Sequence, residues 1–419
     1  MARLTADIGG TASLIVTEND EIVLTDVDTA DGTITVAANG LLTATDVATG
    51  NNNAIDLTGV SLVAGAVNAG TGTVDLDAGT GAITDAAGDV AGGVLTADAT
   101  TGITLTTDVT SADLSVSGTG VIDVTEDNAI VLTDVDTADG TITVAANGLL
   151  TATDVATGND SAIDLTGVGL QVGIVNAGAG AVTLDAGSGA ITDADNDDLT
   201  TDVVAASLTV DDADSIGTST SALNLDVNTL AITNTDGDVF ITNVDALDLG
   251  TSTIGGALDI AVSAGDITND GGALTVAGDA SFTANDGGSI AVDNAANDFA
   301  GAVRFAASAG QLNNVTVVDT TALELQSGLS VGGDLDVTAA GISQAAGGIS
   351  VDGNSSFDAG AGAIDLADAG NDFAGPVALQ AGGDADIQNS GELILGGSSI
   401  GGDLNVAATG ISQSLDAGE

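Results

Sequence analysis

The sequence of 419 residues lacks cysteine, histidine, tryptophan, tyrosine and lysine, and it contains a single proline. Without cysteine the chain forms no disulfide and offers no thiol for redox chemistry. Only 1% of its residues are aromatic, so a thick globular core built on large rings is not expected. No run of 18 apolar residues occurs, and we therefore expect no membrane-inserted segment.

Positive charge is almost absent, because Arg3 and Arg304 face 61 acidic residues and the formal net charge is −59. Nucleic acid and anionic membranes are therefore excluded as partners, since both are bound through Lys and Arg. Six of the acids are Glu and 55 are Asp, a residue typical of turns and poor inside helices. The 44% hydrophobic content argues against the disorder that such a charge would otherwise indicate.

Internal repetition dominates the first half of the chain. The stretch Ile22–Asn51 returns without a change at Ile130–Asn159, about 108 residues further along. Beyond it, Asn68–Ala86 returns with few changes at Asn176–Ala194. A copy this long indicates one structural unit used twice, so we predict a first repeat over residues 11–118 and a second, partial one over 119–215.

A shorter repeat governs the C-terminal half. Gly332–Gln344 returns at Gly401–Gln413, and the sequence NDFAG occurs at Asn297–Gly301 and again at Asn371–Gly375. We therefore predict repeats of about 69–77 residues over 216–419. Both regimes keep the same short strand signals, which predicts one continuous solenoid over residues 1–419.

Strand signals recur about every 20 residues, the step expected of a solenoid coil. One series runs through Ile22, Leu42, Leu62, Ile83 and Ile103, and a second runs through alternating apolar patches at Ile34/Val36, Ile55/Leu57, Val74/Leu76, Val94 and Leu114. Two interleaved series with a common step are typical of stacked coils. The sequence predicts an all-β, right-handed parallel β-helix of about 20 coils, each of roughly 20 residues and three short strands. The 108-residue repeat would then be five coils, one of them longer than the others.

The six Phe residues all lie in the C-terminal half, and we expect their rings inside the core. Phe299 and Phe373 occupy matching repeat positions, which favours a stacked ring over a ligand platform. Arg304 lies between Val303 and Phe305, so strand alternation predicts that its side chain points to solvent.

Several runs resemble the β-strand repeats of giant bacterial surface and secreted proteins related to filamentous haemagglutinin. The runs are LTDVDTADGTITVAANGLLTATDVATG, GAITDA, LDVNTL, STIGGALDIAVSAGDIT, AGDASFTA and VDNAANDFAG. The resemblance extends from about residue 11 to the end, and it implies a right-handed parallel β-helix, export, and a role in adhesion or in a matrix. It implies no particular receptor.

Calcium is the candidate ligand that the acids favour, and we expect no organic cofactor. Carboxylates in glycine-containing turns are hard oxygen ligands for Ca²⁺ or other cations. The alternative is that Asp only caps turns between strands. We predict metal ligation by Asp26, Asp28 and Asp31 and by their copies Asp134, Asp136 and Asp139, with further candidates at Asp193-x-Asp195-x-Asp197 and Asp236-Gly237-Asp238.

The density of charge predicts cation binding even without a built site. At about 4.8 Å per coil, twenty coils give a length of about 95 Å and one charge per about 1.6 Å. Duplex DNA carries a charge every ~1.7 Å and condenses counterions at that density. The same composition is typical of a halophile, and the sequence does not separate the two.

Parallel β-helices also include polysaccharide lyases and hydrolases. A lyase needs cationic groups that this chain lacks, whereas a glycosidase needs two carboxylates, which 61 acids supply by chance. The composition therefore argues against a polysaccharide-active enzyme, and the resemblance implies a non-catalytic stalk segment of a secreted bacterial adhesin or matrix protein, outside the cell or on its surface. Its expected partners are a cell-surface receptor or a matrix polysaccharide.

The alternative function is a self-assembling, cation-stabilised surface filament. Coils that expose unpaired strand edges at the ends of a stack can dock head to tail with another copy. This hypothesis requires polymers in solution, whereas a stalk segment stays monomeric.

Overall fold

A computed structural model describes residues 1–195 and 200–414. Over this part of the chain it contains strands and turns, and no helix that could span a membrane. The strands pair in parallel and stack as a β-solenoid of about 20 turns, which confirms the predicted fold class. The chain divides into two compact units, unit 1 over Met1–Ala213 and unit 2 over Asp214–Glu419. The repeat boundaries drawn from the sequence stay a prediction.

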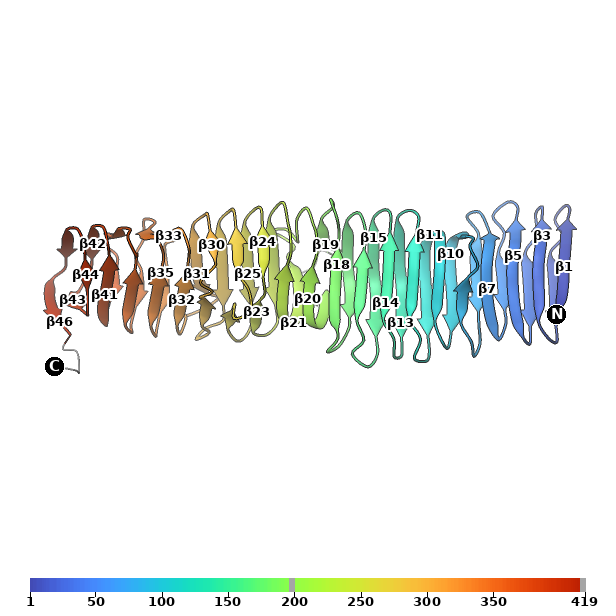
Figure 1. Ribbon diagram of the computed structural model, residues 1–419, viewed down its shortest axis with the longest axis horizontal. Coiled ribbons are helices and arrows are strands. Elements are labelled where there is room, and N and C mark those ends of the chain that lie inside the picture. Colours follow the sequence, from blue (N-terminus) through green and yellow to red (C-terminus); the bar gives the residue numbers. More distant parts are fainter. Residues whose placement is uncertain (196–199, 415–419) are drawn as a thin grey trace. The chain divides into compact units, whose positions relative to one another are not determined.

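In unit 1 the strands form two ladders that run from coil to coil (Figure 1). The strands of unit 1 are β1 (Ala2–Ile8), β2 (Leu14–Glu18), β3 (Ile22–Thr29), β4 (Ile34–Ala38), β5 (Leu41–Thr49), β6 (Ile55–Thr58), β7 (Ser61–Asn68), β8 (Thr73–Asp77), β9 (Ile83–Asp85), β10 (Val90–Ala99), β11 (Ile103–Val116), β12 (Ile122–Glu126), β13 (Ile130–Thr137), β14 (Ile142–Ala146), β15 (Leu150–Thr157), β16 (Ile163–Thr166), β17 (Leu170–Asn176), β18 (Ala181–Asp185), β19 (Ile191–Asp193) and β20 (Val203–Val210).

The first ladder joins β1, β3, β5, β7, β9, the start of β11, β12, β14, β16 and β18. The second ladder joins β2, β4, β6, β8, the later parts of β10 and β11, β13, β15, β17 and β19. Both ladders therefore run through most of unit 1.

Most coils of unit 1 have one long bent strand and one short strand, and in one coil the single long strand β11 carries both ladders. In β3 the inward-facing residues are Ile22, Leu24, Val27 and Thr29, so the alternation shifts by one residue after Leu24. The pairing register shifts at the same place, where Thr5 of β1 pairs with Asp26. The bend lets one strand cover two flat segments of the coil, and the short strand supplies the third.

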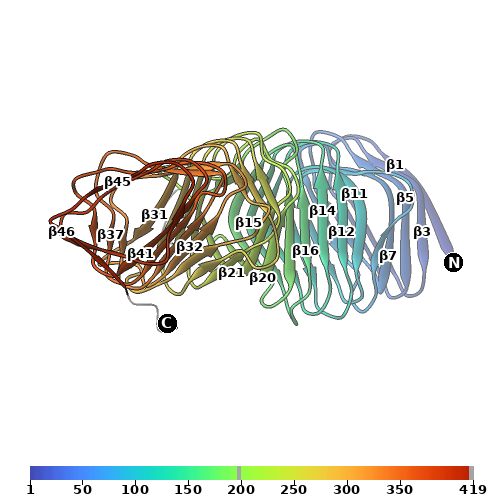
Figure 2. The ribbon, with the colours of Figure 1, turned by 60° about the vertical axis from the view of Figure 1, so that its left-hand side comes forward.

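In unit 2 most strands are short and separate, and they stack from coil to coil (Figure 2). The strands are β21 (Leu223–Ile232), β22 (Val239–Asn243), β23 (Leu247–Leu249), β24 (Ser252–Ile254), β25 (Leu258–Val262), β26 (Ile267–Thr268), β27 (Leu274–Val276), β28 (Ala280–Ala284), β29 (Ile290–Val292), β30 (Asp298–Phe299), β31 (Val303–Ala307), β32 (Val315–Val318), β33 (Ala322–Leu325), β34 (Ser330–Val331), β35 (Leu335–Thr338), β36 (Gly341–Gln344), β37 (Ser350–Val351), β38 (Ser355–Asp358), β39 (Ile364–Leu366), β40 (Asp372–Phe373), β41 (Pro376–Ala381), β42 (Ala385–Gln388), β43 (Glu392–Leu395), β44 (Ser399–Ile400), β45 (Leu404–Ala407) and β46 (Gly410–Gln413).

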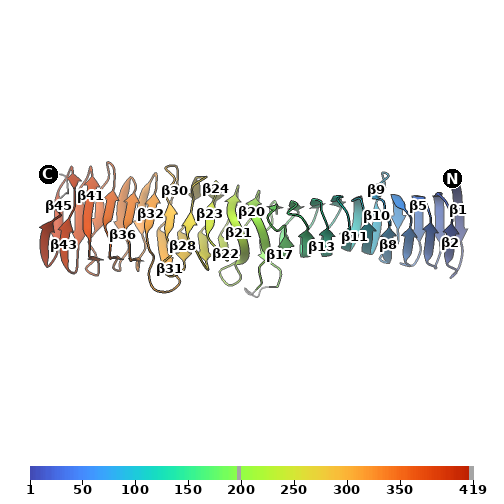
Figure 3. The same cartoon turned by 90° about the horizontal axis from the view of Figure 1, so that it is seen from below.

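The strands of unit 2 form two long ladders and two three-stranded sheets (Figure 3). The third ladder joins β22, β25, β28, β31, β33, β36, β39, β42 and β45. The fourth ladder joins β23, β26, β29, β32, β35, β38, β41, β43 and β46. The short sheets are β24-β27-β30 and β34-β37-β40.

The core consists of aliphatic columns that follow the predicted spacing. Register pairs join Ile22, Leu42, Leu62, Ile83 and Ile103 in order, and each of these side chains is buried, which confirms the first series. These columns remove apolar surface from water at every coil.

The second series departs from the prediction at Val94. Val74 pairs with Leu95, which is buried, whereas Val94 pairs with Thr73 and is 44% exposed. The Gly92–Gly93 pair lies at the bend of β10, where the alternation changes phase, so Leu95 faces inward in place of Val94.

Five of the six Phe rings lie in the core of unit 2, as predicted. Phe282 packs edge-on against Phe299 with ring centroids 6.1 Å apart, and Phe357 does the same against Phe373 at 5.9 Å. The exception is Phe240, which is half-buried. Arg304 is exposed, as strand alternation predicts.

The 108-residue repeat spans five and a half coils, and the expected five coils are wrong. Five register steps along the first ladder lead from Ile22 to Ile122, not to Ile130. Ile130 begins β13, which pairs with the part of β11 that belongs to the second ladder. The copy of β3 therefore lies on the other ladder, and its turn at Asp139–Gly140 stacks on Gly120 rather than along the column that contains Gly32.

The shorter repeats of unit 2 exchange ladders in the same way. Val303 of β31 pairs with Ala280 on the third ladder, whereas its copy Val377 in β41 pairs with Ser355 on the fourth. Likewise β35 lies on the fourth ladder and its copy β45 on the third. Each repeat therefore fills a half-integral number of coils, and successive copies occupy different ladders.

Buried side chains close the sheet edges where a ladder stops. The last strand of one short sheet is β40, where Phe373 N–H donates to Asn389 Oδ1 at 2.9 Å and Asn389 Nδ2 donates back to the Phe373 carbonyl at 3.2 Å. In β30 of the other short sheet, Phe299 N–H donates to Asp319 Oδ1 at 3.1 Å. Asn389 and Asp319 are each 3% exposed, so they replace a missing backbone partner inside the core.

Exchanging amide and carboxylate at these two caps should change stability in opposite directions. Asn389 Nδ2 also donates to the Glu392 carbonyl at 2.8 Å, so Asn389→Asp turns two donated bonds into oxygen–oxygen contacts. We expect a loss of about 2 kcal/mol of unfolding free energy. Asp319→Asn supplies a donor that the carboxylate lacks, and we expect a gain of about 1 kcal/mol.

Urea unfolding followed by circular dichroism at pH 7 measures both changes. Asp245→Asn, at an exposed position, serves as the control for the change in charge. An unchanged midpoint for Asn389→Asp would contradict the role of Asn389 as a buried backbone cap.

Candidate functional site

The first predicted calcium turn places two of its three carboxylates together. Asp26 and Asp28 both point outward from β3, and their carboxyl groups contact each other. Burial, the Asp26 and Asp46 charges, and this contact raise the pKa of Asp28. Asp31 lies in the following turn, where its Oδ1 accepts a bond from Asn53 Nδ2 at 3.3 Å. The structure therefore joins Asp26 to Asp28 and ties Asp31 to the next coil.

The second predicted calcium turn, at Asp134–Asp139, has different neighbouring residues from the first because its strand, β13, lies on the second ladder. Asp134 pairs in register with Asp113, and Asp136 pairs with Ser115. Asp139 is exposed in the turn that follows β13. Calcium ligation by Asp26, Asp28, Asp31, Asp134, Asp136 and Asp139 stays a prediction.

A third group of carboxylates, formed by Asp193, Asp195 and Asp202, brings three acidic side chains together. Oxygen atoms of Asp193, Asp195 and Asp202 lie within 4.8 Å of one another, and within the described ranges this is the group that offers three acidic ligands at such a distance. Asp193 and Asp202 are buried and Asp195 is exposed. The sequence singled out Asp193 and Asp195 but missed Asp202, and the predicted Asp197 lies outside the described residues.

Many of the remaining Asp residues stabilise turns, as the alternative interpretation holds. In the recurring Asp-Ala-Gly turns the carboxylate accepts the glycine N–H at 2.7–2.9 Å, and the glycine has a positive φ of 48–54°: Asp77 and Gly79, Asp185 and Gly187, Asp358 and Gly360. Asp238 Oδ1 accepts the Ala257 N–H of the next coil at 2.8 Å. A left-handed residue is cheapest as glycine, which explains the motif.

A row of carboxylates, here named the acidic ladder, lies on the outer face of the second ladder. Direct register pairs join Asp56 to Asp75, Asp77 to Asp98 and Asp113 to Asp134, about 4.8 Å apart along the stack, and Thr96 and Ser115 stand between these pairs. The acidic ladder consists of Asp56, Asp75, Asp77, Asp98, Asp113, Asp134 and Asp136. Like charges directly opposite each other destabilise a sheet.

Four members of the acidic ladder have a pKa above that of free aspartate. Desolvation, followed by the charges of neighbouring Asp residues, raises the pKa of Asp75, Asp98, Asp113 and Asp136. The described neighbours supply no cation, because the two arginines are remote from these coils in the sequence. The outer face therefore resembles a polyelectrolyte more than a chelating site.

Glu126 is a fully buried carboxylate with a structural role. Its oxygens accept bonds from Thr107 Oγ1 at 2.8 Å and from the N–H groups of Val109 and Asn128 at 3.0 Å. Burial raises the pKa of Glu126, and these donors partly offset that rise. Glu126 caps β11 in the coil where the repeat changes ladder. Like Asn389 and Asp319, it is a buried side chain that accepts a backbone N–H at a strand edge.

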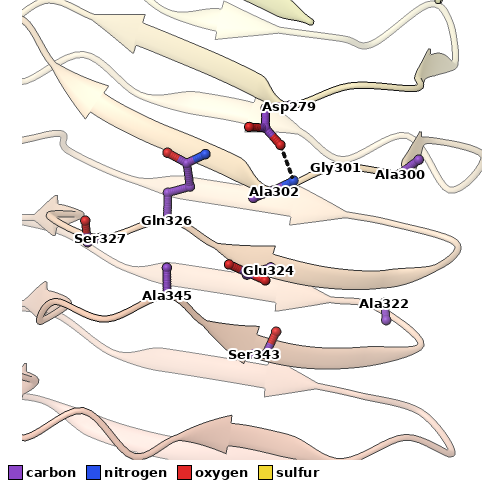
Figure 4. Close-up of a pocket in the computed structure, with 10 residues that line it drawn as sticks. All are labelled: Asp279, Ala300, Gly301, Ala302, Ala322, Glu324, Gln326, Ser327, Ser343 and Ala345. Atoms are coloured by element: carbon purple, nitrogen blue, oxygen red, sulfur yellow. Dashed lines mark hydrogen bonds between the residues drawn. The ribbon is translucent and has the colours of Figure 1, made fainter. Parts of the chain in front are cut away.

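A groove of about 690 Å³ lies on the outer face of unit 2. It opens where β31 and β33 share a single register pair, Val303 with Leu325. Small and polar side chains line it together (Figure 4), and the lining consists of Asp279, Ala300, Gly301, Ala302, Ala322, Glu324, Gln326, Ser327, Ser343 and Ala345. Sequence reasoning did not find this site.

Comparison with known proteins gives a repeat family without an assigned role. Residues 236–306, 312–380 and 382–418 match a family model described as repeats of unknown function (DUF5649). The chain is a repeat protein. No curated protein and no solved structure matches it. The matched segments fall in the C-terminal half, where the sequence predicts the shorter repeats.

The raised pKa values predict that mild acid stabilises the fold. Within the described part of the chain, carboxyl groups with a higher pKa in the folded chain than in a free side chain include Asp28, Asp75, Asp98, Asp113, Glu126, Asp136 and Asp164. The folded protein then binds more protons than the unfolded chain, so its stability falls as pH rises through these values. Asp368, whose pKa two backbone N–H groups lower, opposes the trend.

We expect the melting temperature to rise as the pH falls from 7.5 toward the raised pKa values of these carboxyl groups, measured by calorimetry at fixed ionic strength. The triple variant Asp75→Asn, Asp98→Asn, Asp113→Asn should melt higher at pH 7.5 and depend less on pH. A steady fall in the wild-type melting temperature between pH 7.5 and pH 5 would show that the acidic ladder does not control stability.

Salt should stabilise the chain, and Ca²⁺ should do so more steeply than Na⁺ because a divalent ion screens and bridges carboxylates at lower concentration. Thermal melts in matched NaCl and CaCl₂ series test this. If Asp26, Asp28 and Asp31 form a specific site, replacing all three with Asn should remove part of the calcium increment, whereas Asp245→Asn should not. A melting temperature independent of both salts refutes cation stabilisation.

Proposed function

We propose that this chain is a non-catalytic spacer, a stalk segment of a secreted bacterial adhesin or extracellular matrix protein. The observation that supports it most directly is the continuity of the ladders within each unit. Backbone pairing and a buried aliphatic column join every coil to the next, so each unit resists bending and extension. Such a construction suits a part that holds other parts at a distance.

The side-chain chemistry supports a non-catalytic role. Histidine, cysteine, tyrosine and lysine, which supply most general bases and nucleophiles, are missing from the sequence. The carboxylates with raised pKa values belong to the acidic ladder, to the Asp28 and Asp164 neighbourhoods or to the buried Glu126 cap, and none of them lines the groove at Glu324. A polysaccharide-active enzyme is therefore the weaker alternative.

The resemblance to filamentous-haemagglutinin-like repeats supports the extracellular setting. A chain without cysteine and with 61 acidic residues needs no disulfides for stability and stays soluble in cation-rich surroundings. Calcium or other cations held along the acidic ladder would offset its like-charge repulsion, so we infer that cations rigidify the spacer.

A self-assembling filament is the second candidate, and the last described coil favours it. Leu335 and Ile342 are buried inside the stack, whereas their repeat copies Leu404 and Ile411 are 40% and 58% exposed. In a filament, a second copy docked on the strand edges would cover them.

Light scattering after gel filtration, at micromolar concentration with and without Ca²⁺, separates the two functions. We expect a monomer in both conditions, and electron microscopy should then show isolated particles. Polymers that disappear in the double variant Leu404→Asp, Ile411→Asp would overturn the spacer proposal in favour of the filament. The same changes at the exposed residues Val94 and Val168 provide the control.

A further inference from the structure

We propose that the groove of unit 2 around Glu324 is a binding site for an uncharged oligosaccharide. The site goes beyond a spacer role, which needs no recognition at all. It relies on the proposed extracellular role only for the source of the glycan, a matrix or cell-surface polysaccharide.

The backbone builds the groove at an irregularity of the third ladder. β33 pairs with β36 over four residues but meets β31 at one pair only, so the coils separate next to Ala302. Asp279 Oδ1 accepts the Ala302 N–H at 3.0 Å and fixes the upper side (Figure 4). The groove is therefore held by hydrogen bonds of the fold rather than by a mobile loop.

The polar groups of the groove fit sugar hydroxyls. Glu324 and Ser343 are register neighbours on β33 and β36, and Gln326 extends from the end of β33 over the same opening. A carboxylate accepts bonds from vicinal hydroxyls, while an amide and a serine hydroxyl both donate and accept. The alanine and glycine residues of the lining have small side chains, so they leave room for a sugar ring. A concave site with a few convergent polar groups among small side chains is typical of ligand sites.

The net charge selects among glycans. Asp279 and Glu324 lie in the groove of a chain with 61 acids, so an acidic sugar would be repelled. The six Phe residues are placed outside the groove, which predicts hydrogen bonding rather than ring stacking as the source of affinity. We therefore expect weak binding of an uncharged chain.

The second copy of this region provides an internal comparison. β43 pairs with β46 as β33 pairs with β36, which places Ile394 where Glu324 stands and Gly396 where Gln326 stands. Pro376 occupies the repeat position of Ala302 and has no N–H to donate, whereas the Ala302 N–H is bonded to Asp279. The repeat therefore keeps its backbone pattern without these groups, so neither Glu324 nor Gln326 is required for stacking.

A glycan array probed with the full chain in chelator-containing buffer, followed by calorimetric titration of the strongest uncharged ligand, tests the proposal. We expect binding of uncharged oligosaccharides and a loss of affinity of at least tenfold in the double variant Glu324→Ile, Gln326→Gly, which copies the second repeat. Glu392→Ala, a charge removal in that repeat, should leave affinity unchanged.

Three results would overturn the proposal: no uncharged glycan binds, only acidic or cationic glycans bind, or the double variant binds as tightly as the wild type. Circular dichroism melts confirm that the variants fold. A negative array leaves the spacer role untouched, because that role is judged by the oligomeric state and by the particles seen in the microscope.

Discussion

Parallel backbone pairing between successive coils is the interaction on which the rest of the structure depends. It fixes the coil spacing, and its two-residue alternation decides which side chains enter the core. Ile22, Leu42 and Leu62 stack because their backbones pair, and their burial in turn holds the pairing in register. The same constraint brings Asp113 over Asp134 on the outer face, so the repulsion of the acidic ladder is a direct consequence of the stacking that stabilises the core.

Ladders that end inside the molecule create buried N–H and C=O groups without a strand beside them, and the sequence satisfies these with single polar residues. Glu126, Asp319 and Asn389 are the buried examples that face Val109, Phe299 and Phe373. Each lies where the strand pattern changes. Leaving such a group unpaired costs more than the polar side chain does, which explains why carboxylates and amides occur in a core made mainly of aliphatic residues and phenylalanine.

The sequence predicts the coil and its inward columns because both depend on local alternation. It fails at Val94, where a bend reverses the alternation within one strand, and at the 108-residue repeat, where spacing shows the coil length but not which ladder a strand joins. The site was harder to predict. Asp26 and Asp28 lie two residues apart in one strand, so the sequence shows that their side chains share a face. Asp202 and the groove are brought to their neighbours across turns and coils, where the strand register decides which residues come into contact.

The exchange of ladders also separates structural from specific residues. Because Val303 and Val377 serve different ladders with the same side chain, the repeated residues are those that satisfy any ladder equally well: inward aliphatics, turn glycines and outward Thr and Asp. Recognition needs an arrangement that occurs once. In unit 2 such an arrangement lies where the copies differ, at Glu324 against Ile394 and Gln326 against Gly396. The residues that the repeats share build the coil stack, and the positions at which the copies differ are where a binding function can reside.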